Sequence, residues 1–171
     1  HDRPGANLFK TNPTVLAQCQ ANGPVVRHAG AAGPPVVIHI VGAIVADWVR
    51  TSGIALGEGS RLVVDLPREP VTVVFDPEHL RRVLVNLLDN ARRHASDRPG
   101  AILLQMRRVG AAQASVSLTS DGEPIPPDIE PFLFEPFFST RSRGTGLGLY
   151  ICRELCERYG GGIEYLQHPL G

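Results

Sequence analysis

The segment that most restricts the fold of this chain is a long amphipathic stretch that begins near Asp76. Apolar side chains recur there at intervals of three and four residues, and they are Leu80, Val83, Leu84, Leu87, Leu88 and Ala91. This spacing places them on one side of an α-helix, so that side is expected to face a core. Asp76 and Pro77 suit the N-cap and the first turn. The sequence therefore predicts a helix over 77–95.

Shorter patterns after residue 35 predict that this helix belongs to a compact α/β unit. Apolar runs and alternating runs predict strands over 36–40, 61–66, 71–75, 101–108, 114–119 and 163–166, and helical spacing predicts helices over 43–51 and 147–159. The runs 61–66 and 71–75 are separated by two prolines, and they are predicted to form a hairpin-like pair.

The first 35 residues differ from the rest, because Gly, Pro, Ala and Asn are frequent in them. The stretch 30–35 has the composition of a linker. Pro13 to Gln20 is predicted as a short helix. We expect residues 1–35 to be a linker or the remnant of an upstream region, ordered only in part. Residues 36–171 form the expected domain.

Charge and composition exclude several classes of function. Seventeen basic residues balance 17 acidic ones, so the basic footprint of a nucleic-acid-binding protein is absent. No apolar run reaches the length of about 18 residues that a membrane span needs, and no secretory leader is visible. Cys152 and Cys156 lie one helical turn apart without a second pair of ligands. Packed thiols in a reducing cytoplasm are therefore favoured over a metal site.

Polar residues lie in a narrow sector beside the apolar side of the helix over 77–95. Asn86, Asn90 and Arg93 follow one another at four and three residues. Asparagine is a mediocre helix former, so two of them in mid-helix need an explanation. Two interpretations stay open. The amides are exposed to solvent, or their oxygens meet a hydrated Mg²⁺ and a polyphosphate whose charge Arg93 neutralises.

A glycine-rich turn precedes the helix predicted over 147–159. Gly144, Gly146 and Gly148 alternate with Thr145 and Leu147. Such a turn lets the backbone approach a ligand, and the helix N-terminus offers free N–H groups to an anion. The P-loop pattern is absent. The polar segment 139–145 follows the aromatic run 134–138 and is expected to be mobile until phosphates order it.

Taken in order, four segments resemble the motifs of the ATP-binding domain of sensor histidine kinases. The superfamily of that domain also contains gyrase, the heat-shock chaperone ATPases and the MutL mismatch-repair ATPases. Residues 86–94 are similar to its Asn box, 120–125 to its first glycine box, 134–138 to its Phe box and 144–149 to its second glycine box. The short polar segment 139–145, which we call the flap, and the residues 148–157 resemble the pilus- and nitrogen-regulating kinases in particular.

This resemblance covers about residues 36–166, and it implies both a fold and a site. The fold is a two-layer α/β sandwich of the Bergerat type, a mixed sheet of about five strands with three helices on one face. Asn90 would be the main Mg²⁺ ligand, and Asn86 would assist at the metal or the phosphates; these two are the implied catalytic residues. The other implied ATP-binding positions are Arg93, His94, Ser120, Asp121, Gly122, Ile125, Phe134, Thr140, Arg141, Gly144, Thr145, Gly146, Leu147 and Gly148.

One departure from the family pattern concerns recognition of adenine. The family has D-x-G-x-G, whose Asp accepts a hydrogen bond from the adenine amino group, whereas Ser120 and Pro124 stand at its first and last positions here. Asp121 is one residue away, and neighbours on an extended segment point to opposite sides. Either a local shift brings Asp121 inward, or Ser120 replaces the carboxylate with a weaker hydrogen bond.

Residue 86 also bears on whether the domain hydrolyses ATP or transfers its phosphoryl group. ATP-hydrolysing relatives have a Glu at this position as general base, and an amide cannot take a proton. The resemblance therefore implies a poor hydrolase that donates the γ-phosphoryl group to an external histidine. None of the six histidines has the acceptor context H-[ED]-x-x-x-P. The acceptor is expected on an upstream dimerisation domain outside this chain, and residues 1–35 are then the linker or remnant of that dimerisation region. The resemblance also implies that the closing strand of the family's domain is short after His168.

The chain is accordingly interpreted as the catalytic fragment of a bacterial, cytoplasmic protein-histidine kinase, whose full-length protein is a homodimer that acts on a response regulator. Two alternatives were weighed. A degenerate pseudokinase module that acts through protein contacts would explain Ser120 and Pro124. A gyrase- or chaperone-like ATPase is disfavoured by Asn86 and by the short flap.

Overall fold

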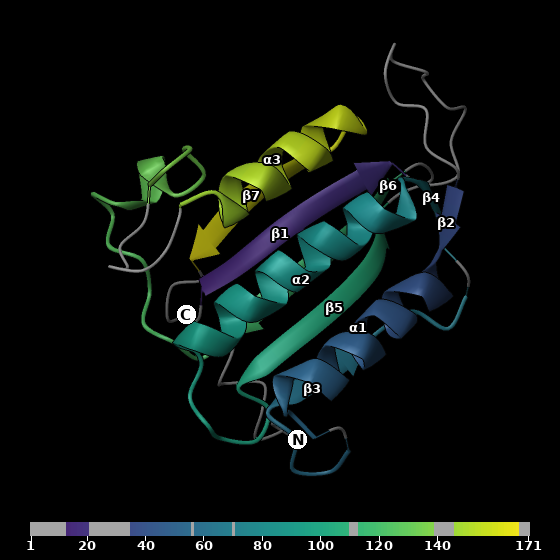
Figure 1. Cartoon of the computed structure of the whole chain (residues 1–171), viewed down its shortest axis with the longest axis horizontal. Coiled ribbons are helices and arrows are strands. Elements are labelled where there is room, and N and C mark those ends of the chain that lie inside the picture. Colours follow the sequence, from purple (N-terminus) through teal and green to yellow (C-terminus); the bar gives the residue numbers. More distant parts are fainter. Residues whose placement is uncertain are drawn as a thin grey trace.

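Two layers make up the part of the chain that the computed structural model describes, which is residues 13–20, 35–55, 57–69, 71–109, 113–138 and 146–167. Three helices lie together on one face of a five-stranded sheet (Figure 1). The helices are α1 (Ile38–Ser52), α2 (Pro77–His94) and α3 (Gly148–Arg158), with a 3₁₀ turn at Glu130–Phe132. The strands are β1 (Pro13–Gln20), β2 (Pro35–Val37), β3 (Leu62–Asp65), β4 (Thr72–Val74), β5 (Ile102–Val109), β6 (Gln113–Ser120) and β7 (Gly162–Gln167).

The main sheet is mixed, with the strand order β3-β5-β6-β1-β7. β3 runs parallel to β5, and every other neighbouring pair in this sheet is antiparallel. β2 and β4 form a separate antiparallel pair. The predicted fold class, a mixed sheet of five strands with three helices on one face, is therefore confirmed.

Helix α2 begins and ends where its sequence predicts. The Asp76 carboxylate accepts a hydrogen bond from the backbone N–H of Glu78 at 2.8 Å, which caps the first turn. All six apolar residues of its periodic pattern are buried, and Leu88 is 0% exposed. This helix is the centre of the helical layer, with α1 on one side and α3 on the other (Figure 1).

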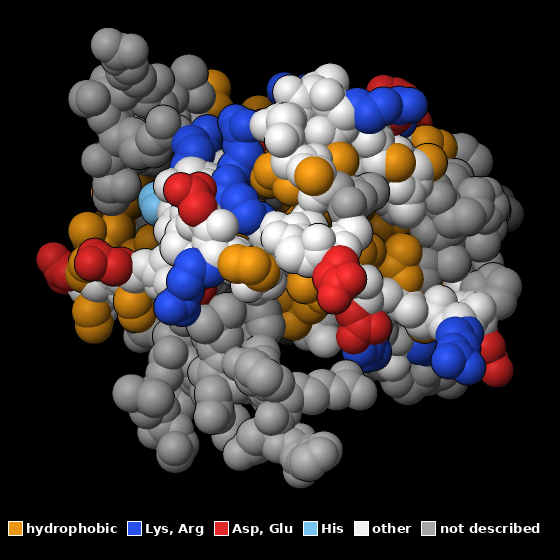
Figure 2. Space-filling view, turned by 90° about the horizontal axis from the view of Figure 1, so that it is seen from below, with side chains coloured by type: hydrophobic (Ala, Val, Ile, Leu, Met, Phe, Trp, Pro, Cys, Tyr) orange, Lys and Arg blue, Asp and Glu red, His pale blue; other side chains and the backbone are white. Residues whose placement is uncertain are grey.

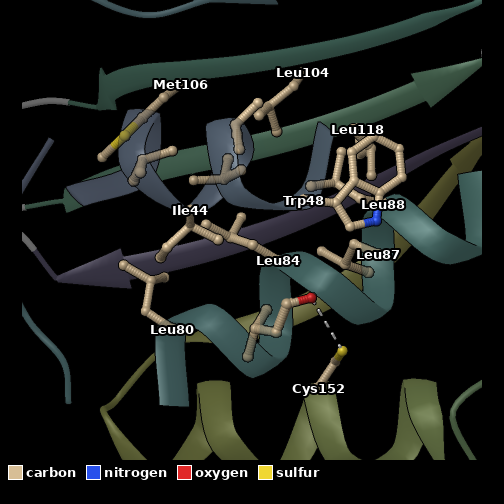
Figure 3. Packing of buried hydrophobic residues seen from close by; sticks show 14 of the residues in the cluster. Ile44, Trp48, Leu80, Leu84, Leu87, Leu88, Leu104, Met106, Leu118 and Cys152 are labelled. Carbon is tan, nitrogen blue, oxygen red and sulfur yellow. Dashed lines mark hydrogen bonds between the residues drawn. The ribbon is translucent and has the colours of Figure 1, made fainter. Parts of the chain in front are cut away.

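The core lies between the helical layer and the inner face of β5 and β6. In Figure 3, Ile44 and Trp48 of α1 and the leucines of α2 meet Leu104, Met106 and Leu118 of the sheet. The Trp48 indole N–H donates to the Asp89 carboxylate at 2.8 Å and so joins α1 to α2. Within the described ranges, no helix is both long and apolar enough to cross a bilayer.

Three local predictions were wrong. Pro13–Gln20 is a strand and not a helix, because two neighbouring strands offer backbone partners along its whole length. The run predicted as a strand over 36–40 turns into α1 at Ile38. β3 and β4 are not a hairpin, since β3 pairs with β5 and β4 pairs with β2.

Candidate functional site

The polar sector of α2 faces the start of α3. Asn86 and Asn90 are half-buried beside the apolar side of α2. The side-chain N–H of Asn86 donates to the carbonyl oxygen of Gly148 at 3.4 Å, although the two residues are 62 positions apart. The asparagine segment and the glycine-rich turn, which were predicted separately, are therefore in direct contact.

The glycine turn also packs against the aromatic segment. Gly146 has a φ of +73°, which lies in the left-handed region that favours glycine. A Cβ atom on Gly146 would lie 2.6 Å from the backbone nitrogen of Phe138 and 2.7 Å from its carbonyl oxygen. Leu147 follows at the N-cap of α3 and is half-buried. Only glycine lets the chain enter α3 at this distance from the aromatic segment.

The aromatic segment itself is divided between the core and solvent. Phe134 is half-buried and packs against the core cluster, whereas Phe137 is 78% exposed. The Glu135 carboxylate lies 3.6 Å from the Arg153 guanidinium of α3. The start of the segment is thus held both by the core and by α3.

The turn after β6 touches the C-terminal end of α2. A Cβ on Gly122 would overlap the carbonyl oxygen of His94 and lie 2.9 Å from its carbonyl carbon. Ser120 is buried, and its hydroxyl accepts a hydrogen bond from the Gly122 N–H at 3.4 Å. The Ile125 N–H donates to the Tyr165 hydroxyl at 2.8 Å. This turn is held by α2 on one side and by β7 on the other.

Asp121 is bound to the loop that follows α2. Its carboxylate accepts a hydrogen bond from the Ser96 N–H at 2.7 Å and a second one from the Ser96 hydroxyl. The Arg98 guanidinium lies 3.8 Å away, and the Asp121 side chain is only 5% exposed. Its carboxylate is therefore hydrogen-bonded and ion-paired by residues outside the predicted site.

The end of α2 beside this turn is basic. Arg92, Arg93 and His94 occupy its last turn, and Arg93 and His94 are exposed. Figure 2 shows basic side chains and a histidine gathered on the side of the molecule where α2 ends. Positive charge near a half-buried amide pair suits an anionic ligand.

The two cysteines of α3 are packed thiols. Cys152 and Cys156 are buried and unbridged, and the Cys152 thiol lies 3.7 Å from the carbonyl oxygen of Val83, the contact drawn in Figure 3. Burial raises the pKa of each thiol to about 12. Neither group is a nucleophile at neutral pH.

Part of the predicted site lies outside the part of the chain that the structure describes. Thr140, Arg141, Gly144 and Thr145 lie outside the described residues, as does the whole segment 139–145.

The sequence analysis missed three residues that hold the site together, namely Ser96, Arg153 and Tyr165. Each acts through a partner far along the chain, so no local pattern marks it.

A two-layer sandwich whose central helix presents an asparagine to a glycine turn is the architecture of the Bergerat class of ATPase domains. Over residues 75–171 the chain matches the family described as histidine kinase-, DNA gyrase B- and HSP90-like ATPase, and it belongs to that family.

Several proteins named as sensor kinases are similar to this chain. The sensor protein kinase PilS of Pseudomonas aeruginosa is 38% identical over 119 residues, which are 68% of this chain and 22% of PilS. The sensory histidine kinase/phosphatase NtrB of Escherichia coli O157:H7 is 31% identical over 67% of this chain and 35% of NtrB. The chain thus spans about a fifth to a third of these relatives.

Solved structures of histidine kinases have the same fold. The mycobacterial sensor histidine kinase MprB superposes with a TM-score of 0.62 at 21% identity, covering 81% of this chain and 100% of that one. Full-length ShkA in complex with AMPPNP has a TM-score of 0.57 at 20% identity, covering 81% of this chain and 31% of ShkA.

Proposed function

We propose that this chain is the catalytic domain of a bacterial sensor histidine kinase, which binds ATP with Mg²⁺ and donates the γ-phosphoryl group to a histidine on a dimerisation domain outside this chain. The observation that carries the proposal is the hydrogen bond between Asn86 and Gly148. It brings one amide group of α2 next to the glycine turn and the N-terminus of α3, where a polyphosphate is best received, and Asn90 follows one helical turn further along α2.

The donor set fits a magnesium–phosphate ligand. Asn86 and Asn90 offer uncharged amide oxygens, and Mg²⁺ takes one or two protein oxygens together with phosphate oxygens. The nitrogen of the Asn86 amide is engaged with Gly148, and its oxygen keeps its acceptor capacity. Asn90, Asn86 and the phosphates would hold the ion, and bound Mg²⁺ would neutralise charge on the transferring phosphate. Arg93 would bind phosphate at the basic end of α2.

The chemistry of residue 86 favours phosphoryl transfer to an external acceptor. An amide cannot take a proton from water, so the chain offers no general base there. What the residues supply is orientation: the α2 amides, the glycine turn and the start of α3 would hold the γ-phosphoryl group for attack by a histidine from another domain. We extend the proposal to the whole protein as a cytoplasmic-facing homodimer that transfers phosphate onward to a response regulator.

The position of Asp121 supports a particular form of adenine recognition. Its carboxylate is bound by Ser96 and Arg98, which favours Ser120 as the residue that meets the adenine amino group. A hydrogen bond to a carboxylate is worth about 1.5–3 kcal/mol and one to a hydroxyl about 0.5–1.5 kcal/mol, so adenine affinity is expected to be about five- to tenfold lower than in a site with Asp.

The binding of the Asp121 carboxylate by Ser96 and Arg98 also favours a second candidate function. This is a pseudokinase module that has lost tight nucleotide binding and acts through protein contacts. Calorimetric titration with Mg²⁺ and AMPPNP separates the two. Saturable binding that Asn90→Ala abolishes supports the kinase domain, and no binding by the folded parent supports the pseudokinase. Transfer of label from γ-labelled ATP to the histidine of the full-length protein then tests the reaction itself.

A further inference from the structure

One strand of the main sheet comes from a distant part of the chain. β6 and β7 follow one another along the sequence, yet they do not pair, because β1 lies between them. β1 is antiparallel to both, from Thr14 opposite Thr119 of β6 and from Pro13 opposite Gln167 of β7 (Figure 1). In such a position the N–H and C=O groups of the strand alternate between the two neighbours, and β1 is paired on both sides from Thr14 to Gln18.

The attachment of β7 to the sheet depends on this strand. β7 is at the edge of the sheet, and within the described ranges β1 is its one ladder partner. Without β1, packing against α3 is the principal contact that holds β7 on the domain.

β7 in turn holds two parts of the candidate site. It packs beneath α3, whose first residue, Gly148, is bound by Asn86. Its Tyr165, which is 8% exposed, accepts the hydrogen bond of the Ile125 N–H and so fixes the turn that follows β6. The glycine turn and the turn over 121–125 therefore depend on the same edge strand.

We propose that β1 is a positioning strand, whose insertion between β6 and β7 sets the geometry of the nucleotide site and whose withdrawal weakens nucleotide binding. Residues 21–34 separate β1 from β2, and 14 residues reach up to about 46 Å when extended. β1 is therefore able to leave the sheet without moving β2 or α1. The binding readout of this inference rests on the proposed function, whereas its structural readout does not.

The test uses the full chain with proline substitutions. Ala17 lies in the middle of β1, opposite Val116 and Ile163, and a proline there removes a ladder donor from a central strand. Ala32→Pro is the matched control, because it adds the same residue to a stretch that already contains Pro34 and Pro35. Amide hydrogen exchange and AMPPNP affinity are measured on both variants, with and without an added peptide of the sequence Pro13–Gln20.

We expect Ala17→Pro to lose protection in β7 and in the β6 amides that face β1, to keep protection in β3 and β5, and to lose about tenfold or more in affinity. The added peptide restores the amide protection and the AMPPNP affinity, and Ala32→Pro changes neither of these two quantities. Unchanged protection of β7 would show that β1 does not hold it. Lost protection with unchanged affinity would show that the site does not depend on β1. If the parent binds no AMPPNP, the proposed function fails, and the exchange data still decide whether β1 holds β7.

A second variant covers the outcome in which Ala17→Pro loses protection in every strand. Tyr165→Phe removes only the hydroxyl that binds the Ile125 N–H. We expect faster exchange of the Ile125 amide and a severalfold loss of affinity, with the protection of β1 unchanged. Normal affinity in this variant would refute the link from β7 to the site.

Discussion

Gly146→Ala is the sharpest single test of how the glycine turn is built. The residue has a φ of +73°, and a methyl group there would lie 2.6 Å from the nitrogen and 2.7 Å from the oxygen of Phe138. The left-handed conformation costs an alanine about 1–2 kcal/mol. The overlap is with backbone atoms, which cannot rotate away, and such overpacking costs about 1–3 kcal/mol more.

These two contributions predict a loss of about 2–5 kcal/mol in the free energy of unfolding. For a domain of this size, each kcal/mol corresponds to about 2–4 °C, so the midpoint of thermal unfolding should fall by about 4–20 °C. Where the turn shifts instead of unfolding the domain, the loss appears in AMPPNP affinity, since the start of α3 and its contact with Asn86 move together. Differential scanning calorimetry and isothermal titration measure the two effects.

Gly42→Ala is the matched control. Gly42 is in α1, and a Cβ there would meet only the Leu66 side chain at an ordinary 4.0 Å. Replacing a helical glycine by alanine should stabilise the protein by about 0.5–1 kcal/mol and leave binding unchanged. Equal stability and equal affinity of Gly146→Ala and the parent would refute the close approach of the glycine turn to the aromatic segment.

Three further results are expected. Asn90→Ala should abolish Mg²⁺-dependent AMPPNP binding in calorimetry. The free energy of unfolding should change by about 0.5 kcal/mol or less, because the side chain is half-buried beside the core. An unfolded variant would assign the residue a structural role. Ser120→Asp should tighten ATP binding about five- to tenfold and lower the thermal midpoint of the ligand-free protein, and unchanged affinity would place the adenine base elsewhere. Burial raises the pKa of Cys152 and Cys156 from 9.0 to about 12, so the folded state holds protons that the unfolded state loses between these values. Their contribution to stability is thus complete below pH 9 and is lost as the pH rises toward 12. In a Cys19→Ser background, iodoacetamide at about pH 8.5 should label these two thiols only after denaturation, and rapid labelling of the native protein would contradict their burial.

Local sequence was sufficient for the helices on which the site is built. The apolar spacing of α2 and the Asp76 cap act within a few residues of each other, and the helix is found at Pro77–His94, close to the predicted 77–95. The same holds for α3, which is found at Gly148–Arg158 within the predicted 147–159. The motif order further indicated that the asparagines and the glycine turn belong to one site, and the contact between Asn86 and Gly148 agrees with it.

Tertiary structure decided which strands pair and where the charged groups of the site lie. A run such as 61–66 carries the same alternation whether its partner is β4 or β5, and the parallel pairing of β3 with β5 depends on a segment 40 positions away. Asp121 was one of two candidates for adenine recognition, and its carboxylate is bound by Ser96, a residue in no motif.

The position of β1 shows most clearly that local sequence does not predict strand pairing. Nothing within Pro13–Gln20 specifies a place between β6 and β7, and local reasoning predicted a helix there. The strand forms because two ladders, to residues about 100 and 150 positions away, supply hydrogen-bond partners that a helix would otherwise provide within the segment. The sequence by itself determined helices α2 and α3 and the residues of the motifs, because their signals are local. Only the tertiary structure decided the pairing of the strands and the partners of the site residues, because backbone hydrogen bonds between strands do not depend on the identity of the side chains.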